Sequence, residues 1–425
     1  MRFVRFFVVA AVLAGVLSLG TAWAQGGVVD TQRDEALRRK QGIADRPRPQ
    51  YDAVGIRAGG FIIYPDLTFV QMYDDNIFSQ ESNTTSDFIA IVSPQIQAKS
   101  NWSRHELDFS ARGDIGRYFD KGSENYEDVL LESLGRYDIS RDSNIFGGVS
   151  YASRHEDRGS PDDVQGINPT IFETLTPQIG FFQKLGRFKV RLVGDLHRFD
   201  FRDVASSTGL ILNNDDRDRN EYSASGAVAY EIVPAYDAFV RFTYSKINYL
   251  SSVDDFGIDR DSHGYEFVAG TAVDITGVIF GNVFVGYRKQ KYDDVVLSDI
   301  SGPGYGADIT WNVTGLTTLK FLISRGIEET TLAGGSGLFA TRIGGSVDHE
   351  LLRNLVLNAN GSIQFNNYEG INRDDTIYRA AASGRYFLNR NLYVSLAYEF
   401  LKRESSTIGQ NFTVNTFLIR LETQL

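Results

Sequence analysis

The last stretch of the chain, FTVNTFLIRLETQL at Phe412–Leu425, decides how the rest of the sequence is interpreted. Its alternate residues separate into a mostly apolar row that includes Ile419 and Leu421 and a row that carries Arg420 and Glu422. Because successive side chains of a strand point to opposite faces, this pattern predicts a β-strand with one apolar face. Such a strand needs a neighbour to cover its edge. The stretch predicts either the closing strand of a β-barrel in an outer membrane or an edge strand of a soluble sheet.

The composition favours the barrel and excludes several other classes. The 425 residues include 41 Gly, 21 Tyr and 29 Phe, and the mean hydropathy is -0.22. A bundle of transmembrane helices is excluded because it needs repeated apolar runs of about 20 residues, whereas lipid-facing and lumen-facing residues alternate in a barrel. The net charge of -11 argues against nucleic acid as a partner. Cysteine is absent, which removes disulfides, thiolate metal ligands and a lipid-carrying N-terminal Cys.

The N-terminus predicts export. Residues 1–24 have the pattern of a signal peptide, with Arg2 and Arg5 before an apolar run and Ala22-Trp23-Ala24 as the cleavage site. Residues 25–58 are basic, with a short helix predicted over residues 34–41, and they indicate a periplasmic N-terminal segment or a flexible tail. Residues 59–425 are predicted to form the barrel.

Alternation continues through the whole of residues 59–425. The clearest example is Leu355–Asn366, where Leu357, Ile363 and Phe365 share one side and Asn358 and Gln364 lie on the other. Tight turns, for example at 141–143 and 352–354, alternate with long polar connections, for example at 155–168 and 202–218. One-sided sorting of loops is typical of outer-membrane barrels. The sequence therefore predicts an all-β fold, a transmembrane antiparallel up-and-down β-barrel of about 18 strands with short periplasmic turns and long extracellular loops.

One segment carries a family resemblance. The run RPRPQYDAVGIRAGGFIIYPDLTFVQMYDDNIF at Arg46–Phe78 resembles the opening of the β-barrel porin type 2 family of Gram-negative outer membranes, most clearly in Gly55-Ile56-Arg57 and in the box Tyr73–Phe78. The likeness continues diffusely to the C-terminus. Members of this family are often associated with exopolysaccharide synthesis and export, and the resemblance implies that association here. Leu425 departs from the family because such barrels usually end in an aromatic residue.

Polar residues on the inward rows are the candidates for function. An 18-strand barrel is wide enough to hold water, and mixed Arg, Asp and Asn side chains could bind sugar hydroxyls or acidic glycans, or could simply keep the pore hydrated. The lumen-lining candidates are Asp108, Arg112, Asp114, Lys189, Arg191, Asp195, Arg241, Asn358, Asn360, Gln364 and Glu399. No cofactor, metal site or catalytic residue is predicted.

Two weaker site patterns are present in the long loops. His155 and His263 lie near Ser160 and Asp157 on the predicted rim, which is the composition of a hydrolase triad but also of any polar loop. Paired acids such as Asp162-Asp163 could bind divalent cations that bridge to lipopolysaccharide, or could be solvated.

Three functions follow as expectations. The first is a porin-like conduit of the cell outer membrane linked to exopolysaccharide export. The second is a structural or adaptor barrel with a blocked lumen that binds partners through its loops. The third is a barrel hydrolase, which is the less favoured alternative because the protein is expected not to be an enzyme. Expected partners are outer-membrane lipids and lipopolysaccharide, the barrel-assembly machinery, and polysaccharide or its export components.

Overall fold

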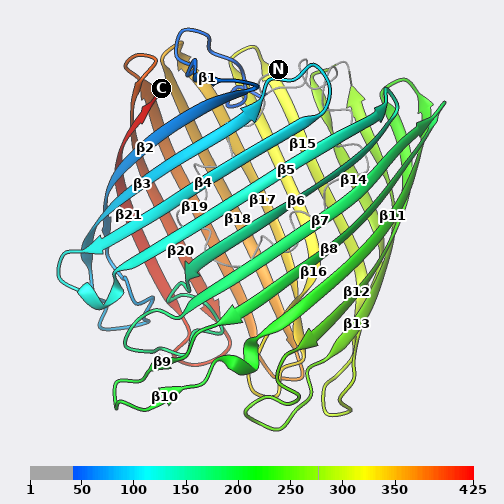
Figure 1. Ribbon diagram of the computed structural model, residues 1–425. Coiled ribbons are helices and arrows are strands. Elements are labelled where there is room, and N and C mark those ends of the chain that lie inside the picture. Colours follow the sequence, from blue (N-terminus) through cyan, green and yellow to red (C-terminus); the bar gives the residue numbers. More distant parts are fainter. Residues whose placement is uncertain (1–41, 276) are drawn as a thin grey trace.

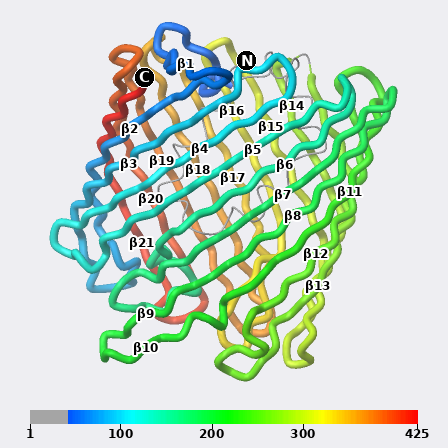
Figure 2. The backbone as a smooth tube through the Cα atoms, viewed as in Figure 1, coloured from blue at the N-terminus to red at the C-terminus, as the bar shows by residue number. Residues whose placement is uncertain are grey.

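In the computed structural model, which describes residues 42–275 and 277–425, the chain forms a closed antiparallel β-barrel of 18 strands (Figure 1). The strands follow one another around the wall in chain order, and Figure 2 shows their common tilt. They are β2 (Phe61–Asp74), β3 (Asp87–Ser100), β4 (Glu106–Tyr118), β5 (Tyr126–Ser140), β6 (Ser143–His155), β7 (Ile171–Leu185), β8 (Phe188–Phe201), β11 (Arg219–Val233), β12 (Tyr236–Tyr249), β13 (Ser262–Ile275), β14 (Ile279–Tyr292), β15 (Ile300–Thr314), β16 (Thr317–Glu329), β17 (Gly337–Leu352), β18 (Leu355–Glu369), β19 (Asp374–Phe387), β20 (Leu392–Ser405) and β21 (Phe412–Gln424).

The last strand closes the barrel. β21 pairs with β20 on one side and with β2 on the other, in a register that runs from Asp66 opposite Gln424 to Asp74 opposite Thr416. These are the neighbours expected of a last strand that closes a barrel, the preceding strand and the first one. Beyond the end of β21, the short strand β1 (Ile56–Ala58) takes its place beside the first residues of β2. The edge of β2 is therefore paired along almost its whole length.

The two ends of the barrel differ as the turn pattern predicts. At the short-turn end, which is the upper end in Figure 1 and carries β1 and the C-terminus, strands are joined by tight turns such as Gly186–Arg187. At the long-loop end the connections are longer and include the small strands β9 (Val204–Ala205) and β10 (Ile211–Leu212) and the 3-10 turns η3 (Gly122–Glu124) and η4 (Asp215–Arg217). No helix in the described residues is long and apolar enough to cross a membrane.

The wall splits between β15 and β16 at the long-loop end. β14 pairs with β15 from Ile300 onward, but β16 joins β15 only from Tyr305 opposite Arg325. The unpaired stretch contains Pro303, which has no N–H to donate to a ladder. Above the split, the ring of Phe339 approaches Gly302, a residue on the inner row of β15. The tip of the β16–β17 hairpin therefore bends into the barrel.

Some predictions concern details of the chain. The connection expected over residues 291–303 is shorter, because β15 begins at Ile300 and its glycine-rich start belongs to the wall. The predicted signal peptide and the helix expected at residues 34–41 lie outside the described residues, as does Thr276 in one predicted turn.

Candidate functional site: the barrel lumen

The two faces of the wall have different chemistry. On β21, Phe417 and Ile419 are 53% and 57% exposed on the outer surface, whereas Arg420 and Gln424, on the alternate row, are 9% and 7% exposed. The same alternation appears on β8, where Leu192 is exposed and Lys189 is buried. An exposed apolar outer row matches hydrocarbon, and the polar row faces the lumen.

All the sequence-predicted candidates lie on the inner row, and most of them have protein partners. Arg112 on β4 forms an ion pair with Asp114, two residues along the same strand, at 2.7 Å. The Lys189 ammonium binds the Asp237 carboxylate on β12 at 2.7 Å, spanning the intervening strand β11. Both ion pairs neutralise charge within the wall, and the second also ties β8 to β12.

The candidates on the β7–β14 side contact aromatic rings and acids. Arg191 stacks on Phe146, with the guanidinium carbon 4.6 Å from the ring centre. Arg241 lies 3.5 Å from the Glu266 carboxylate. Asp195 accepts a hydrogen bond from the Ser223 hydroxyl at 3.1 Å. On this side, the two arginines stack on inner aromatic rings, Arg191 on Phe146 and Arg241 on Phe284.

The β17–β20 side is rich in amides. Asn358 donates to Asp348 at 2.8 Å, and Asn360 donates to Asn358 at 3.0 Å. Gln364 is almost fully buried and accepts hydrogen bonds from Arg342. Glu399, with Thr416 as its neighbour on β21, completes the predicted set.

The family box folds over the inner wall beside the closing seam. Asn76 is 1% exposed and donates to the carbonyl oxygens of Gln80 and Thr413 at 2.8 and 3.0 Å. Ile77 packs into an apolar cluster on the inner row of the three seam strands β2, β3 and β21, whose other buried members are Val70, Met72, Ile89, Ile91 and Leu418. The box therefore holds the first loop against the place where the first and last strands meet.

A loop crosses the lumen at the long-loop end. This bridging loop, residues 156–170, joins β6 to β7, and the Asp162 carboxylate accepts a hydrogen bond from the Thr330 hydroxyl at 2.8 Å. Thr330 follows β16. Around the wall, six strands (β8 and β11–β15) separate the β6–β7 hairpin from the β16–β17 hairpin in one direction, and eight strands (β2–β5 and β18–β21) separate them in the other. The carbonyl of Gly159 also accepts from Arg403 on β20 at 3.0 Å. The bridging loop therefore spans the barrel nearly from side to side.

Buried ion pairs fix the base of the bridging loop. Glu156 forms a two-pronged ion pair with Arg217 of η4 at 2.7 and 2.9 Å, and both side chains are almost fully buried. Arg158 forms a similar pair with Glu124 at 2.8 and 2.9 Å. Burial raises the pKa of the Asp163 carboxyl to about 6, although Arg158 opposes the shift. Bidentate arginine–carboxylate pairs are strong and directional, so the base of the loop is rigid.

The tip of the β16–β17 hairpin, which bends into the lumen, is also held by a third loop. Arg260, in the loop between β12 and β13, donates to the carbonyl oxygens of Thr330 and Gly335 at 2.9 Å each. Arg260 itself pairs with Asp254 at 2.8 Å, and both side chains are 2% exposed. Glu329 at the tip accepts from the Tyr292 hydroxyl on the inner row at 3.2 Å. Three loops therefore meet over the lumen.

The described N-terminal residues contact the short-turn end. The backbone N–H of Ile43 donates to Thr318 on the inner row at 2.9 Å. Arg48 lies 3.4 Å from Glu350 beside the β17–β18 turn. The carbonyl of Tyr51 accepts from Gln424 at 2.9 Å. Residues 42–55 therefore lie across one side of this opening.

The two weaker site patterns resolve into structural contacts. The Ser160 hydroxyl donates to Glu156 rather than to a histidine, and the His155 ring is 3.0 Å from the Asp128 carboxylate. His263 faces Asp293 at 3.6 Å. The hydrolase hypothesis thus has no serine–histidine pair among the described side chains. Nor do the described residues include a group of three His, Asp or Glu side chains that could hold a metal ion.

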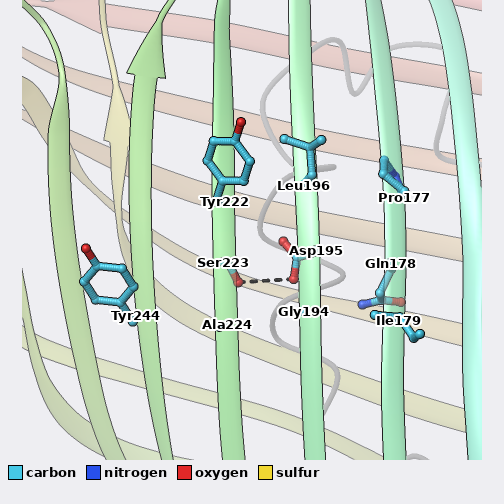
Figure 3. A pocket seen from close by; sticks show the side chains of 10 residues that line it. All are labelled: Pro177, Gln178, Ile179, Gly194, Asp195, Leu196, Tyr222, Ser223, Ala224 and Tyr244. Carbon is cyan, nitrogen blue, oxygen red and sulfur yellow. Dashed lines mark hydrogen bonds between the residues drawn. The ribbon is translucent and has the colours of Figure 1, made fainter.

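A shallow hollow lies on the outer surface of the wall rather than in the lumen (Figure 3). It is centred on Gly194, which has no side chain, and the exposed side chains of Ile179, Tyr222 and Tyr244 surround it. Asp195 and Ser223, hydrogen-bonded to each other in Figure 3, belong to the inner row behind it. The hollow faces hydrocarbon and is separate from the polar site.

This combination of features defines the class of protein. A closed antiparallel barrel with an apolar outer row, tight turns at one end and long loops at the other is an outer-membrane β-barrel. The chain belongs to the β-barrel porin family whose model, described as "Putative beta-barrel porin 2", matches residues 48–425. The match confirms the resemblance seen in the sequence, and the long-loop end is accordingly the extracellular one. No curated protein matches this sequence.

Solved barrels of Pseudomonas aeruginosa are similar in fold. OpdK with vanillate is 10% identical, with 85% of this chain and 99% of that chain covered and a TM-score of 0.44. OpdO is 12% identical, with 86% and 97% covered and a TM-score of 0.45. A mutant of the ferric enterobactin receptor PfeA is 8% identical, with 85% and 80% covered and a TM-score of 0.46.

Several lumen residues were not among the sequence candidates. Arg342 on β17, Arg379 on β19 and Arg288 on β14 all lie on the inner row, as does Glu266. Plain alternation would have found Arg342, because Ile343 and Val347 mark the opposite row of the same strand. Arg288 stands in a glycine-rich stretch where the alternation is weak.

Proposed function

We propose that this barrel is an outer-membrane conduit for hydrophilic molecules and that it serves the export of a glycan. The observation that carries the proposal is the inner row itself, which presents guanidinium, amide and hydroxyl groups around the lumen, including the exposed amide of Asn360. Hydroxyl-rich chains exchange hydrogen bonds with such a surface at little cost, because each lost contact with water is replaced. The family resemblance supports the link to exopolysaccharide.

The asymmetry of the two ends supports the direction. At the long-loop end, the described residues tie three loops together over the lumen through Asp162, Thr330 and Arg260. Next to the short-turn end, inner-row residues such as Asn360 remain exposed. A conduit closed on its outer side protects the cell until cargo arrives from the periplasm.

Planar-bilayer recording of the refolded full chain tests this proposal. Stable conductance steps, blocked by the polysaccharide of the producing cell, are the expected result. Replacing Arg112 with glutamine should change ion selectivity, because the Asp114 carboxylate then loses its partner. The proposal is contradicted if the barrel shows no conductance at any voltage and if loop variants that open the long-loop end show none either.

The second candidate is an adaptor barrel whose lumen stays blocked and whose loops bind partners. The bridging loop favours it, since its contacts reach both Thr330 and Arg403 across the lumen. Silence in bilayers together with specific capture of an export component by the long loops would favour this function over the first.

A further inference from the structure

Two arginines inside the barrel share one neutral acceptor. Arg342 on β17 donates to the side-chain oxygen of Gln364 on β18 at 2.7 and 3.2 Å, and Arg379 on β19 approaches the same oxygen at 3.5 Å. Among the described residues, neither guanidinium has a carboxylate within 4.0 Å. Other inner arginines do, for example Arg112 and Arg288. We call Arg342 and Arg379 the arginine pair.

The side-chain amides of Gln364 and Asn366, which lie next to the arginine pair, have a fixed orientation. Because the Gln364 oxygen accepts from the arginines, its nitrogen must donate, and it donates to the Asn366 oxygen at 2.8 Å. This leaves the Asn366 nitrogen as a donor, and that atom is buried without a hydrogen-bond partner in a residue that is 1% exposed. The two amide oxygens of the cluster are thus already used as acceptors, and the guanidinium groups keep further N–H donors, which is the chemistry of an anion site.

Some of the inner-row residues beside the arginine pair are small. Arg379 lies between Ser362 on β18 and Leu401 on β20, and Arg342 is followed on its own inner row by Gly344. Both arginine side chains remain partly exposed. The exposed parts of both guanidiniums can therefore contact a ligand in the lumen.

The acids nearest to the pair belong to the elements that close the long-loop end. Electrostatic attraction on Arg379 comes from Asp157 at the base of the bridging loop and from Glu328 at the inturned β16–β17 tip, while Arg342 repels it. Glu328 also attracts Arg342, Arg379 and Arg288 through space, and one of its oxygens is buried without a hydrogen-bond partner. The pair thus attracts both closing elements through space without a direct ion pair.

We propose that the arginine pair binds an acidic group of the exported glycan, and that this anion competes with Asp157 and Glu328 and so loosens the closed long-loop end. The inference rests on the proposed function in one respect, that the ligand is a glycan passing through the lumen. The chemistry recognised is a carboxylate, because two guanidiniums side by side match its two oxygens. Uronic acids are the sugars that carry this group.

Binding is measured on the full chain folded in detergent, by isothermal titration with oligogalacturonate. Wild type should bind it, and a neutral malto-oligosaccharide of matched length should not bind. The double variant Arg342→Gln/Arg379→Gln should bind oligogalacturonate about tenfold more weakly or worse, since it loses charge-assisted hydrogen bonds. Arg379→Lys should retain part of the affinity. Heat-modifiable migration confirms that each variant is a folded barrel.

The matched control is Arg202→Gln, which removes an exposed arginine paired with Glu173 outside the lumen. It should leave binding unchanged. Equal affinity in wild type and in the double variant would overturn the site, and binding of inorganic phosphate but not of oligogalacturonate would overturn the glycan assignment. In bilayers, oligogalacturonate on the short-turn side should make channel openings more frequent, and each opening should be interrupted by blocking events while the glycan occupies the lumen. A silent channel that still binds oligogalacturonate through the pair contradicts the conduit but not the site.

Discussion

The Asp162 carboxylate and the Thr330 hydroxyl are hydrogen-bonded at 2.8 Å although their hairpins stand on opposite sides of the barrel. The same Asp162 oxygen also accepts from the backbone N–H of Thr331 at 3.3 Å. These bonds join the bridging loop to the inturned β16–β17 tip, and they are the contacts by which the two largest closing elements hold each other.

Removing this contact should open the barrel. In Asp162→Ala the tip loses a charged acceptor, which is worth roughly 1.5–3 kcal/mol, so the ratio of open to closed states should rise about tenfold or more. Single-channel recording measures that ratio directly. Asp374→Ala, a change of another acid at the long-loop end, should leave it unaltered. An unchanged ratio in Asp162→Ala would show that the bridging loop does not limit conduction.

Breaking the buried pair at the base of the bridging loop should be costly. In Glu156→Ala the Arg217 guanidinium stays buried without its carboxylate, and such a loss costs about 3–5 kcal/mol. The loop should then become sensitive to limited proteolysis while the barrel remains folded. The comparison is Glu173→Ala, which breaks a solvent-exposed pair with Arg202 and should cost less than about 1 kcal/mol. Equal protease resistance in the two variants would refute a structural role for the buried pair.

Closure of the bridging loop should depend on pH. The pKa of Asp163 is about 6 in the closed loop and 3.8 in its ordinary state. A carboxyl with the higher pKa in the closed state takes up protons on closure, so closure strengthens as pH falls from neutrality through about 6 and stops strengthening below about 4. Conductance should therefore fall on acidification over this range.

Two variants identify the titrating group. Asp163→Asn is uncharged at every pH and should reduce the fall in conductance on acidification. Burial also raises the pKa of Asp218 to about 6, on the loop before β11, so Asp218→Asn is the matched control and should keep that fall. The assignment fails if Asp163→Asn responds to acid as wild type does.

Assembly should require the final strand. Deleting residues 412–425 removes the partners of both β2 and β20 and exposes two strand edges in lipid, where unpaired backbone groups each cost several kcal/mol. Loss of heat-modifiable migration is the expected result. Deleting residues 206–210, the tip between β9 and β10, should preserve it. A folded barrel without the last strand would disprove the seam assignment.

A charge on the outer row should be tolerated much less well than on the inner row. Ile419→Arg places a cation against hydrocarbon and should cost about 2–4 kcal/mol near the middle of the membrane. Asn360→Arg on the inner row should cost much less, because Asn360 is exposed and the lumen is polar. Urea unfolding in detergent or lipid measures both, and equal costs would mean that the two faces are misassigned.

The wall could be predicted from the sequence because it follows a local rule. Alternation at Leu421 and Arg420 fixes which row faces lipid, and tight turns between strands fix the order around the barrel. The closure of the long-loop end does not follow such a rule. Phe339 belongs to the outer row by position yet packs inside, because the hairpin bends where β15 and β16 part. Asp162 and Thr330 are 168 positions apart and carry no pattern that links them.

The contact between Tyr51 and Gln424 has a consequence for biogenesis. The Tyr51 carbonyl receives hydrogen bonds from Gln424 and from the Tyr393 hydroxyl, so the end of a segment made early is secured by residues made near the end of the chain. Contacts of such large sequence separation form late in folding. The early segment can settle only on a finished barrel, so its docking marks the completion of assembly, and a half-built barrel would leave it accessible to periplasmic proteases or chaperones.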